Sequence, residues 1–270
     1  MSSKMSYIPL INSYDDIREA MKEDFNYRME TRTTATSLGR PLYYRINLQV
    51  VMTHECPFHC PFCLERQNPM SGDDKFDKQI ESLKRVLLEH PDARMSITGG
   101  EPGLYPEHVR NLVETFEQNS NGVFCSINTT GINTDLNGLA HINLSKNDYV
   151  HNDHTKFPGC TVQVINERPT IQYIKDYMKM DASSFSFRFL SELRKKDYPV
   201  DVWNELQADK DVNIHTFRIG DFFAYATFDY CGKHARLTLG DMWQQKQNQY
   251  RDGYSNIIIH PDGRVATNWR

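Results

Sequence analysis

Hydrophobic residues along the chain follow two alternating spacings, which predict strands and helices in turn. Residues 42–52 are rich in β-branched and aromatic side chains with partial alternation, a pattern typical of a strand. Residues 74–90 carry apolar side chains at helical spacing and are followed by Pro91, which predicts an amphipathic helix. By the same criteria we predict strands at residues 94–98, 123–128, 141–145, 161–166 and 184–190, and helices at residues 13–31, 106–118 and 170–180.

Six strand signals separated by helices are what a parallel sheet of βαβ units requires. Right-handed crossovers would curl such a sheet into a barrel or part of one. We therefore predict an α/β fold, a partial (β/α)6 barrel like a TIM barrel, over residues 42–190, preceded by an N-terminal helix and connector in residues 1–41. Residues 191–270 are expected to form a C-terminal extension that contains β structure and covers one mouth of the barrel. Its predicted elements are a helix at 200–207, strands at 212–217 and 222–227, and a hairpin at 256–268.

Three of the six cysteines lie within eight residues, at Cys56, Cys60 and Cys63, directly after the first predicted strand. Thiolates bind iron when they are deprotonated and grouped. Three of them on one short loop can each hold one iron of a cubic cluster and leave the fourth iron open to an outside ligand. A tetrahedral zinc site is the alternative, because His54 and His59 stand close enough in the sequence to complete one.

A second motif, Gly99-Gly100-Glu101-Pro102, ends the strand predicted at residues 94–98. Adjacent glycines after a strand allow the backbone to pass close to a ligand that a Cβ atom would block. Glu101 then presents a negatively charged acceptor. The simpler interpretation is a strand-to-helix turn with a capping glutamate.

The two motifs together resemble the radical S-adenosylmethionine (radical SAM) superfamily. The cysteine spacing matches, Phe62 stands where the family has an aromatic residue, and Gly99 follows Cys63 by about 36 residues. The resemblance implies a barrel of the radical SAM type with one 4Fe–4S cluster on the three cysteines, and SAM chelating the open iron. It also implies that Gly99, Gly100 and Glu101 bind the amino group of SAM. The reaction would be reductive cleavage of SAM to a 5′-deoxyadenosyl radical that abstracts a hydrogen atom, with an external one-electron reductant of the flavodoxin or ferredoxin type.

Ligands of parallel α/β folds bind at the carboxyl ends of the strands, so we expect polar residues there to face the same site. By its place on the fourth strand, Ser145 resembles the family residue that contacts the ribose or carboxylate of SAM. Asn143 is the alternative, because a one-residue change of register turns a strand's side chains to the other face. Asn128 either contacts SAM or caps a turn. Arg188 either pairs with the SAM carboxylate or an acidic substrate through its bidentate fork, or lies on the surface.

Two further features suggest chemistry less directly. Cys231 could donate a hydrogen atom to a substrate radical, as in some epimerase-type members of the family. Because it is the one cysteine after Cys160, the ligands for a second cluster are lacking, which disfavours the multi-cluster maturases and the molybdenum-cofactor cyclases. His141, His151 and His154 would form a metal or acid–base site on one interpretation and a polar loop on the other.

Composition narrows the classes of function. The formal net charge of −4 and the pI near 6.2 argue against a nucleic-acid binder, which would show a basic excess. No apolar run approaches the roughly 18 residues of a membrane span, and the N-terminal sequence does not resemble a signal peptide, so a cytoplasmic location is expected. Cys125, Cys160 and Cys231 are scattered, unlike a disulfide framework.

The preferred function is therefore a single-cluster radical SAM enzyme acting on a small-molecule or nucleotide-type substrate. The second choice within the family is a peptide- or protein-modifying enzyme. The alternative from another class is a zinc-binding structural or interaction module.

Overall fold

The computed structural model describes residues 47–63, 74–121, 124–166, 170–189, 200–219, 224–239 and 256–267. These residues belong to two compact units of the chain. The first unit holds the described residues from 47 to 162 together with those from 256 to 267. The second unit holds those from 163 to 239.

The sheet of the first unit is built around four parallel strands that pair in chain order. They are β1 (Asn47–Val51), β2 (Arg94–Thr98), β3 (Cys125–Thr129) and β4 (His141–Lys146). The other edge of β1 pairs in parallel with β10 (Asn256–Ile259), which continues into the antiparallel strand β11 (Val265–Ala266). The strand that leads into the cysteine loop is therefore hydrogen-bonded on both sides.

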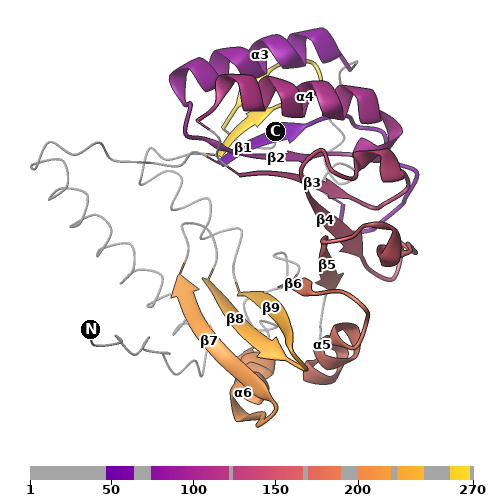
Figure 1. Ribbon diagram of the computed structural model, residues 1–270, viewed down its shortest axis with the longest axis vertical. Helices are drawn as coiled ribbons and strands as arrows, with labels where there is room; N and C mark the ends of the chain where they lie inside the picture. Colours follow the sequence, from indigo (N-terminus) through magenta and orange to yellow (C-terminus); the bar gives the residue numbers. More distant parts are fainter. Residues whose placement is uncertain are drawn as a thin grey trace, which may run out of the picture. The chain divides into compact units, whose positions relative to one another are not determined.

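Helices α3 (Phe76–Glu89) and α4 (Pro106–Asn119) lie side by side over this sheet (Figure 1). Pro106 suits the first position of a helix, because the N–H that it lacks would have no intrahelical partner there. The described connections include the 3-10 turns η1 (Pro102–Leu104), η2 (Thr134–Leu136) and η3 (His154–Lys156). In the described part of the chain, none of the helices combines the length and the apolar character that crossing a membrane requires.

Alternation along the strands gives the sheet of the first unit two different faces. One face is apolar and almost completely buried, with Leu48, Val50, Met95, Ile97, Ile127 and Leu144. It faces the buried sides of the two helices, which contribute Leu83, Leu87, Val109, Leu112 and Phe116. The other face carries half-buried polar residues, among them Gln49, Ser96, Asn128 and Asn143. Burial of the apolar face stabilises the unit and leaves the polar face for ligands.

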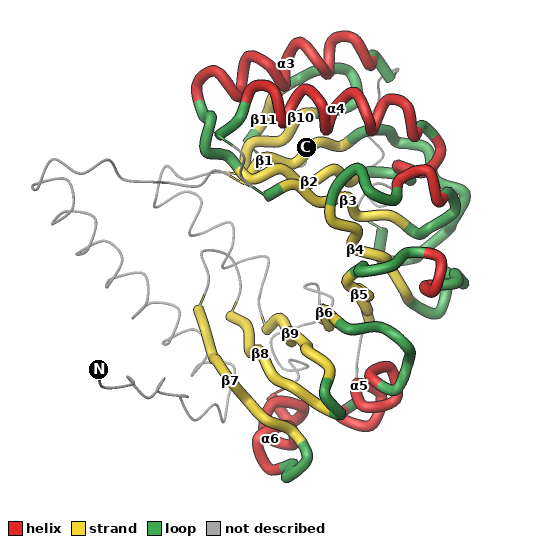
Figure 2. Tube along the Cα trace, in the orientation of Figure 1, coloured by secondary structure: helices red, strands yellow, loops and turns green. Residues whose placement is uncertain are grey.

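The chain passes into the second unit within β5 (Thr161–Asn166), and the described residues of that unit continue with two helices and four further strands. These elements are α5 (Ile171–Met178), β6 (Ser184–Phe189), α6 (Val200–Ala208), β7 (Val212–Ile219), β8 (Ala224–Tyr230) and β9 (Lys233–Leu239) (Figure 2). β6 pairs in parallel with β9, and β9, β8 and β7 follow one another as antiparallel neighbours.

The predicted fold class is confirmed: the chain is a mixed α/β protein with mostly parallel strands. The predicted helices and strands from residue 74 onward occur within a few residues of their expected places, and the hairpin after residue 256 is antiparallel as expected. β9 was not predicted, although its sequence alternates polar and apolar residues. The helix predicted at 13–31 and the connector at 32–41 lie outside the described residues. The domain boundaries at residues 42 and 190 stay predictions.

Candidate active site

The cysteine loop leaves the carboxyl end of β1 along a short segment held by polar contacts. The amide of Met52 donates to the carbonyl oxygen of Thr98 at 2.8 Å, which continues the pairing of β1 with β2. The Thr53 side chain is buried, and its hydroxyl donates to Asp74 at 2.5 Å and accepts from the amide of Glu55 at 3.1 Å. These contacts fix the direction in which the chain enters the loop.

A second set of buried polar contacts holds the carboxyl end of β1 from the side of α3. The side-chain amide of Gln79 on α3 donates to the carbonyl oxygens of Val51 at 2.8 Å and His260 at 3.0 Å. Its oxygen lies 2.7 Å from Nε2 of His108 on α4, so the His108 ring must carry its proton on Nε2. The ring also stacks on Phe76, with centroids 4.0 Å apart. One glutamine thus connects β1, both helices and the segment that follows β10.

The three loop thiols are half-buried, and the loop turns where the amide of Cys63 donates to the carbonyl oxygen of Cys60 at 3.1 Å. Burial raises the pKa of the Cys56 thiol above its ordinary value. A main-chain hydrogen bond from Phe58 opposes this, and the charges of Glu101, Cys63 and Cys60 add to it. Without a bound metal ion, the Cys56 side chain is therefore a neutral thiol. A coordinated cation would reverse this, because a thiol bound to a metal ion loses its proton.

A single zinc ion would need its ligand atoms close together. Thiolates at about 2.3 Å from a tetrahedral zinc lie about 3.8 Å from one another. Among the described residues, the loop cysteines with His54 and His59 form no group of three ligand atoms within 4.8 Å of one another. A cluster in which each thiolate binds a different iron does not require three ligand atoms to meet at one ion.

The double glycine after β2 packs directly on the segment that leads into the cysteine loop. The amide of Gly100 donates to the carbonyl oxygen of Thr53, and the amide of Glu101 donates to that of Glu55, both at 2.7 Å. A Cβ atom on Gly100 would lie 2.0 Å from the carbonyl oxygen of Glu55, and Gly99 has a φ of +116°. A double glycine after a strand predicts the close approach of a ligand. In the structure, the backbone that a Cβ atom would meet belongs to the chain itself.

The Glu101 carboxylate is completely buried and accepts four hydrogen bonds from its own chain. Oε1 accepts from the amide of Gly103 at 2.7 Å and from the hydroxyl of Thr129. Oε2 accepts from the amide of Thr130 at 2.7 Å and from its hydroxyl at 2.6 Å. This matches the simpler interpretation of Glu101 as a capping glutamate, since it caps η1. Contact of Glu101 with the amino group of SAM stays a prediction.

The segment after β4 contacts the cysteine loop from another side. Asn147 is buried, and its Oδ1 lies 4.0 Å from Sγ of Cys60 and accepts from the amide of Tyr149 at 2.8 Å. The ring of Tyr149 meets the ring of Phe62 edge to face, with centroids 6.0 Å apart. Sequence reasoning missed Asn147. The available signal was the polar run that follows the fourth strand.

A row of polar side chains crosses the face of the sheet opposite the helices. Nδ2 of Asn128 donates to Oγ of Ser96 at 2.9 Å, and Oδ1 of Asn128 accepts from Asn143 at 3.0 Å. Asn143 and Ser145 are two residues apart on β4 and therefore point to the same face. Either one can face a ligand together with Asn128, so the choice between them does not depend on register.

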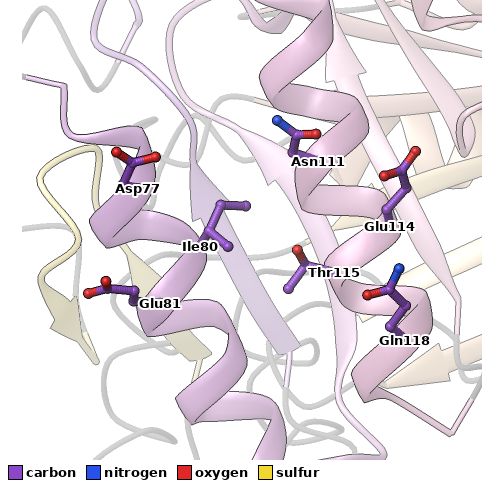
Figure 3. Close-up of a pocket in the computed structure, with 7 residues that line it drawn as sticks. All are labelled: Asp77, Ile80, Glu81, Asn111, Glu114, Thr115 and Gln118. Carbon is purple, nitrogen blue, oxygen red and sulfur yellow. The ribbon is translucent and has the colours of Figure 1, made fainter.

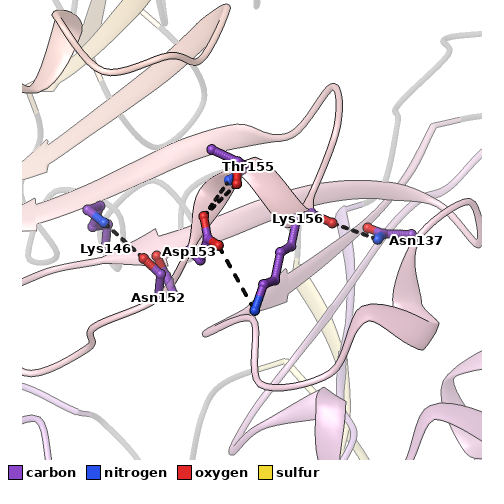
Figure 4. Close-up of polar contacts among 6 residues, drawn as sticks. All are labelled: Asn137, Lys146, Asn152, Asp153, Thr155 and Lys156. Atoms are coloured by element: carbon purple, nitrogen blue, oxygen red, sulfur yellow. Dashed lines mark hydrogen bonds and ion pairs between the residues drawn. The ribbon is translucent and has the colours of Figure 1, made fainter.

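The three histidines singled out in the sequence do not form a metal site. His141 lies at the amino end of β4, where its Nε2 is 3.0 Å from the Thr161 hydroxyl. Asp153 caps η3 by accepting from the amide of Thr155 at 3.2 Å, and it also accepts from the Thr155 hydroxyl at 2.6 Å (Figure 4). Among the described residues, no three ligand atoms of this segment converge. The interpretation as a polar loop is the one that the contacts support.

Arg188 and Cys231 both lie in the second unit. Arg188 stands near the carboxyl end of β6, opposite Thr238 of β9, and burial together with the nearby Arg236 holds its pKa below the ordinary value. Cys231 is exposed in the two-residue turn between β8 and β9, with a φ of +51°. That turn adjoins the amino end of β6, because Ser184 pairs with His234. This position does not favour the role of hydrogen donor, which stays a prediction, as does the role of Arg188.

An open groove of about 550 Å³ lies between α3 and α4 on the outer side of the first unit (Figure 3). Its lining includes the carboxylates of Asp77, Glu81 and Glu114. The helices separate this acidic groove from the polar face of the sheet, so it plays no part in the site around the cysteines.

Comparison with known proteins places this geometry in context. A family model described as the radical SAM superfamily matches residues 50–218. A probable GTP 3′,8-cyclase of Metallosphaera sedula is 36% identical over 115 residues, which make up 40% of this chain and 35% of that protein. The chain thus spans about a third of the length of this curated relative.

Two solved structures share the fold. SuiB of Streptococcus suis bound to the precursor peptide SuiA has a TM-score of 0.56 and 14% identity, over 99% of this chain and 67% of that one. Native anSMEcpe with bound AdoMet has a TM-score of 0.51 and 16% identity, over 83% of this chain and 74% of that one. At these identities the likeness concerns the fold alone.

Proposed function

The chain belongs to the radical SAM superfamily, and we propose that it abstracts a hydrogen atom from a small-molecule or nucleotide-type substrate. An enzyme of this type carries a 4Fe–4S cluster and binds SAM. Together they supply one-electron cleavage of SAM to a 5′-deoxyadenosyl radical, the species that attacks the substrate. In this proposal Cys56, Cys60 and Cys63 hold the cluster.

The observation that carries the assignment of the cluster is the arrangement of protein around the three cysteines. Gly100 and Glu101 hold one side of the loop through main-chain hydrogen bonds to Thr53 and Glu55. Asn147 and Tyr149 contact the loop from another side. Among the described residues the three thiols do not converge as the ligands of one zinc ion would. Three thiolates that each bind a different iron would leave the fourth iron of the cluster for SAM.

The polar face of the sheet is the proposed place for SAM and the substrate. Each side-chain amide has two N–H donors and an oxygen with two lone pairs. Asn128 uses one donor and one lone pair within the row, and Asn143 uses one donor. The remaining groups suit the hydroxyl and ring nitrogen atoms of a nucleoside. Burial of this face on binding would exclude water from the radical.

A nucleotide-type substrate is favoured over a peptide by the relative that is 36% identical over 115 residues, whose name specifies GTP as its substrate. The two solved structures do not weigh on this choice, because they show only the fold. The alternative is that the enzyme acts on a peptide, and the experiment below distinguishes the two substrate classes.

The test follows the hydrogen atom. The anaerobically reconstituted enzyme is mixed with SAM, dithionite and deuterated nucleoside triphosphates, and 5′-deoxyadenosine is examined by mass spectrometry. We expect deuterium in 5′-deoxyadenosine with at least one nucleotide, and a loss of about tenfold or more with Asn128→Ala, because a buried polar contact is removed. SAM cleavage without transfer from any nucleotide, but with transfer from a deuterated peptide mixture, would contradict the substrate class alone.

A further inference from the structure

Three side chains with metal-binding atoms converge on one face of the antiparallel sheet in the second unit. Asp229 on β8 pairs directly with His234 on β9 and with Asn213 on β7. His215 lies two residues beyond Asn213, at a bulge between Ile214 and Thr216. Three adjacent strands therefore each contribute one residue to the cluster His215–Asp229–His234.

The distances within this cluster are short. Nε2 of His215 lies 2.6 Å from Oδ2 of Asp229, and Nδ1 of His234 lies 2.9 Å from Oδ1. All three ligand atoms lie within 4.8 Å of one another. Each side chain is between 39% and 55% exposed, so an ion from solvent can reach all of them.

The scaffold beneath the cluster is rigid. The residues that alternate with Asp229 and His234 along their strands, Phe228 and Ala235, are completely buried. Strands with one buried face have a fixed register, since a slip would expose the apolar side chains. A bulge re-aims a side chain locally, which is how His215 reaches Asp229. Ligands fixed in this way lose little freedom when an ion binds.

Two imidazole nitrogens and one carboxylate oxygen are a ligand set for divalent transition metals, above all zinc. Ligand atoms at about 2.0–2.1 Å from a tetrahedral ion lie about 3.3 Å apart. The two observed contacts would therefore open by less than about 1 Å. As simple surface ion pairs the same contacts would contribute little to stability, about 0–1 kcal/mol.

We propose that His215, Asp229 and His234 form a second metal site, which binds one divalent transition-metal ion such as zinc and is independent of the iron–sulfur cluster. Three protein ligands leave a position of the ion for water or another ligand. The ion would connect β7, β8 and β9, and it would stabilise the folded state by binding it in preference to the unfolded chain.

Zinc itself is the probe. The full chain is reconstituted with its iron–sulfur cluster, so that the loop cysteines are occupied, and is then dialysed against zinc. Zinc per chain is measured by mass spectrometry, its ligands by X-ray absorption at the zinc edge, and the melting temperature by calorimetry. His234→Gln and Asp229→Asn are compared with His90→Gln, a histidine in the first unit outside the cluster.

We expect one zinc per chain with nitrogen and oxygen ligands and a zinc-dependent rise in melting temperature. Each of the two cluster variants should weaken binding about tenfold or more and lose that rise, and His90→Gln should keep both. Sulfur in the first coordination shell, or equal zinc in all four proteins, would overturn the proposal. X-ray absorption identifies the zinc ligands in the unmutated protein, so this part of the test does not depend on whether a variant folds.

Discussion

A Cβ atom at Gly100 would lie 2.0 Å from the carbonyl oxygen of Glu55, so the turn after β2 and the segment before the cysteines fit together only with glycine at this position. Gly100→Ala should therefore force the two segments apart. We expect it to lower the free energy of unfolding by about 1–3 kcal/mol, the usual range for overpacking. We also expect less iron per reconstituted chain, because the cysteine loop moves with the segment.

The matched control is Gly159→Ala. Gly159 has a φ of +73° with open space around the position of its Cβ atom. This variant should lose about 1–2 kcal/mol from backbone strain alone and keep full iron content. Equal iron content in both variants would contradict the account of Gly100.

Glu101→Gln tests whether the buried carboxylate organises the site. The amide would place an N–H group against donors that now reach an oxygen, so we expect a loss of about 3 kcal/mol in urea unfolding. Thr130→Val removes one of the four donors and should cost about 1.5 kcal/mol. If Glu101 acted only on SAM, Glu101→Gln would lower SAM affinity while the unfolding curve stayed unchanged.

His108 gives the first unit a pH dependence. Burial lowers its pKa to about 4, partly opposed by Asp77, compared with about 6.5 in an unfolded chain. Between these values the unfolded chain binds more protons than the folded chain. The contribution of the neutral His108 ring to stability is therefore fully present above about pH 6.5 and is lost as the pH drops from about 6.5 to about 4. The loss should be about 2 kcal/mol at pH 5 and should reach about 3 kcal/mol below pH 4. NMR titration of the ring and unfolding at pH 7 and pH 5 measure it, and His108→Gln should flatten the difference.

Asn147→Asp would place a negative charge beside the Cys60 sulfur, 4.0 Å from the present amide oxygen. We take the new carboxylate and the charge that the cluster gains on reduction as unit charges about 7 Å apart. At an effective dielectric constant of 20 they interact by about 2 kcal/mol, or roughly 100 mV for one electron. The cluster should then be harder to reduce by about that amount in a redox titration followed by EPR. Gln118→Glu, which adds the same charge at the far end of α4, should leave the potential unchanged.

The sequence predicted most of the fold because its strands and helices obey their own periodicities. The regular elements from residue 74 to residue 189 occur close to their predicted places. β10 was expected to belong to a covering extension, yet it pairs with β1. Hairpin signals in a sequence are local, whereas the pairing of residues about 200 positions apart depends on tertiary contacts.

The candidate site was predicted only in part, for a similar reason. The cysteines and the Gly-Gly-Glu-Pro motif are short local patterns that a sequence shows directly. The four hydrogen bonds to Glu101 come from residues up to 29 positions away, and the contact of Cys60 with Asn147 joins residues 87 positions apart. The spacing of residues along the sequence does not predict such contacts. The same holds for His215, Asp229 and His234, which a bulge brings together.

The most direct test of the central claim is anaerobic reconstitution of the chain with iron and sulfide, followed by addition of SAM and dithionite. The account predicts a brown protein with about four irons per chain that releases 5′-deoxyadenosine. A variant with Cys56, Cys60 and Cys63 replaced by alanine should show neither property. A colourless protein that binds zinc through these cysteines and leaves SAM intact would contradict it.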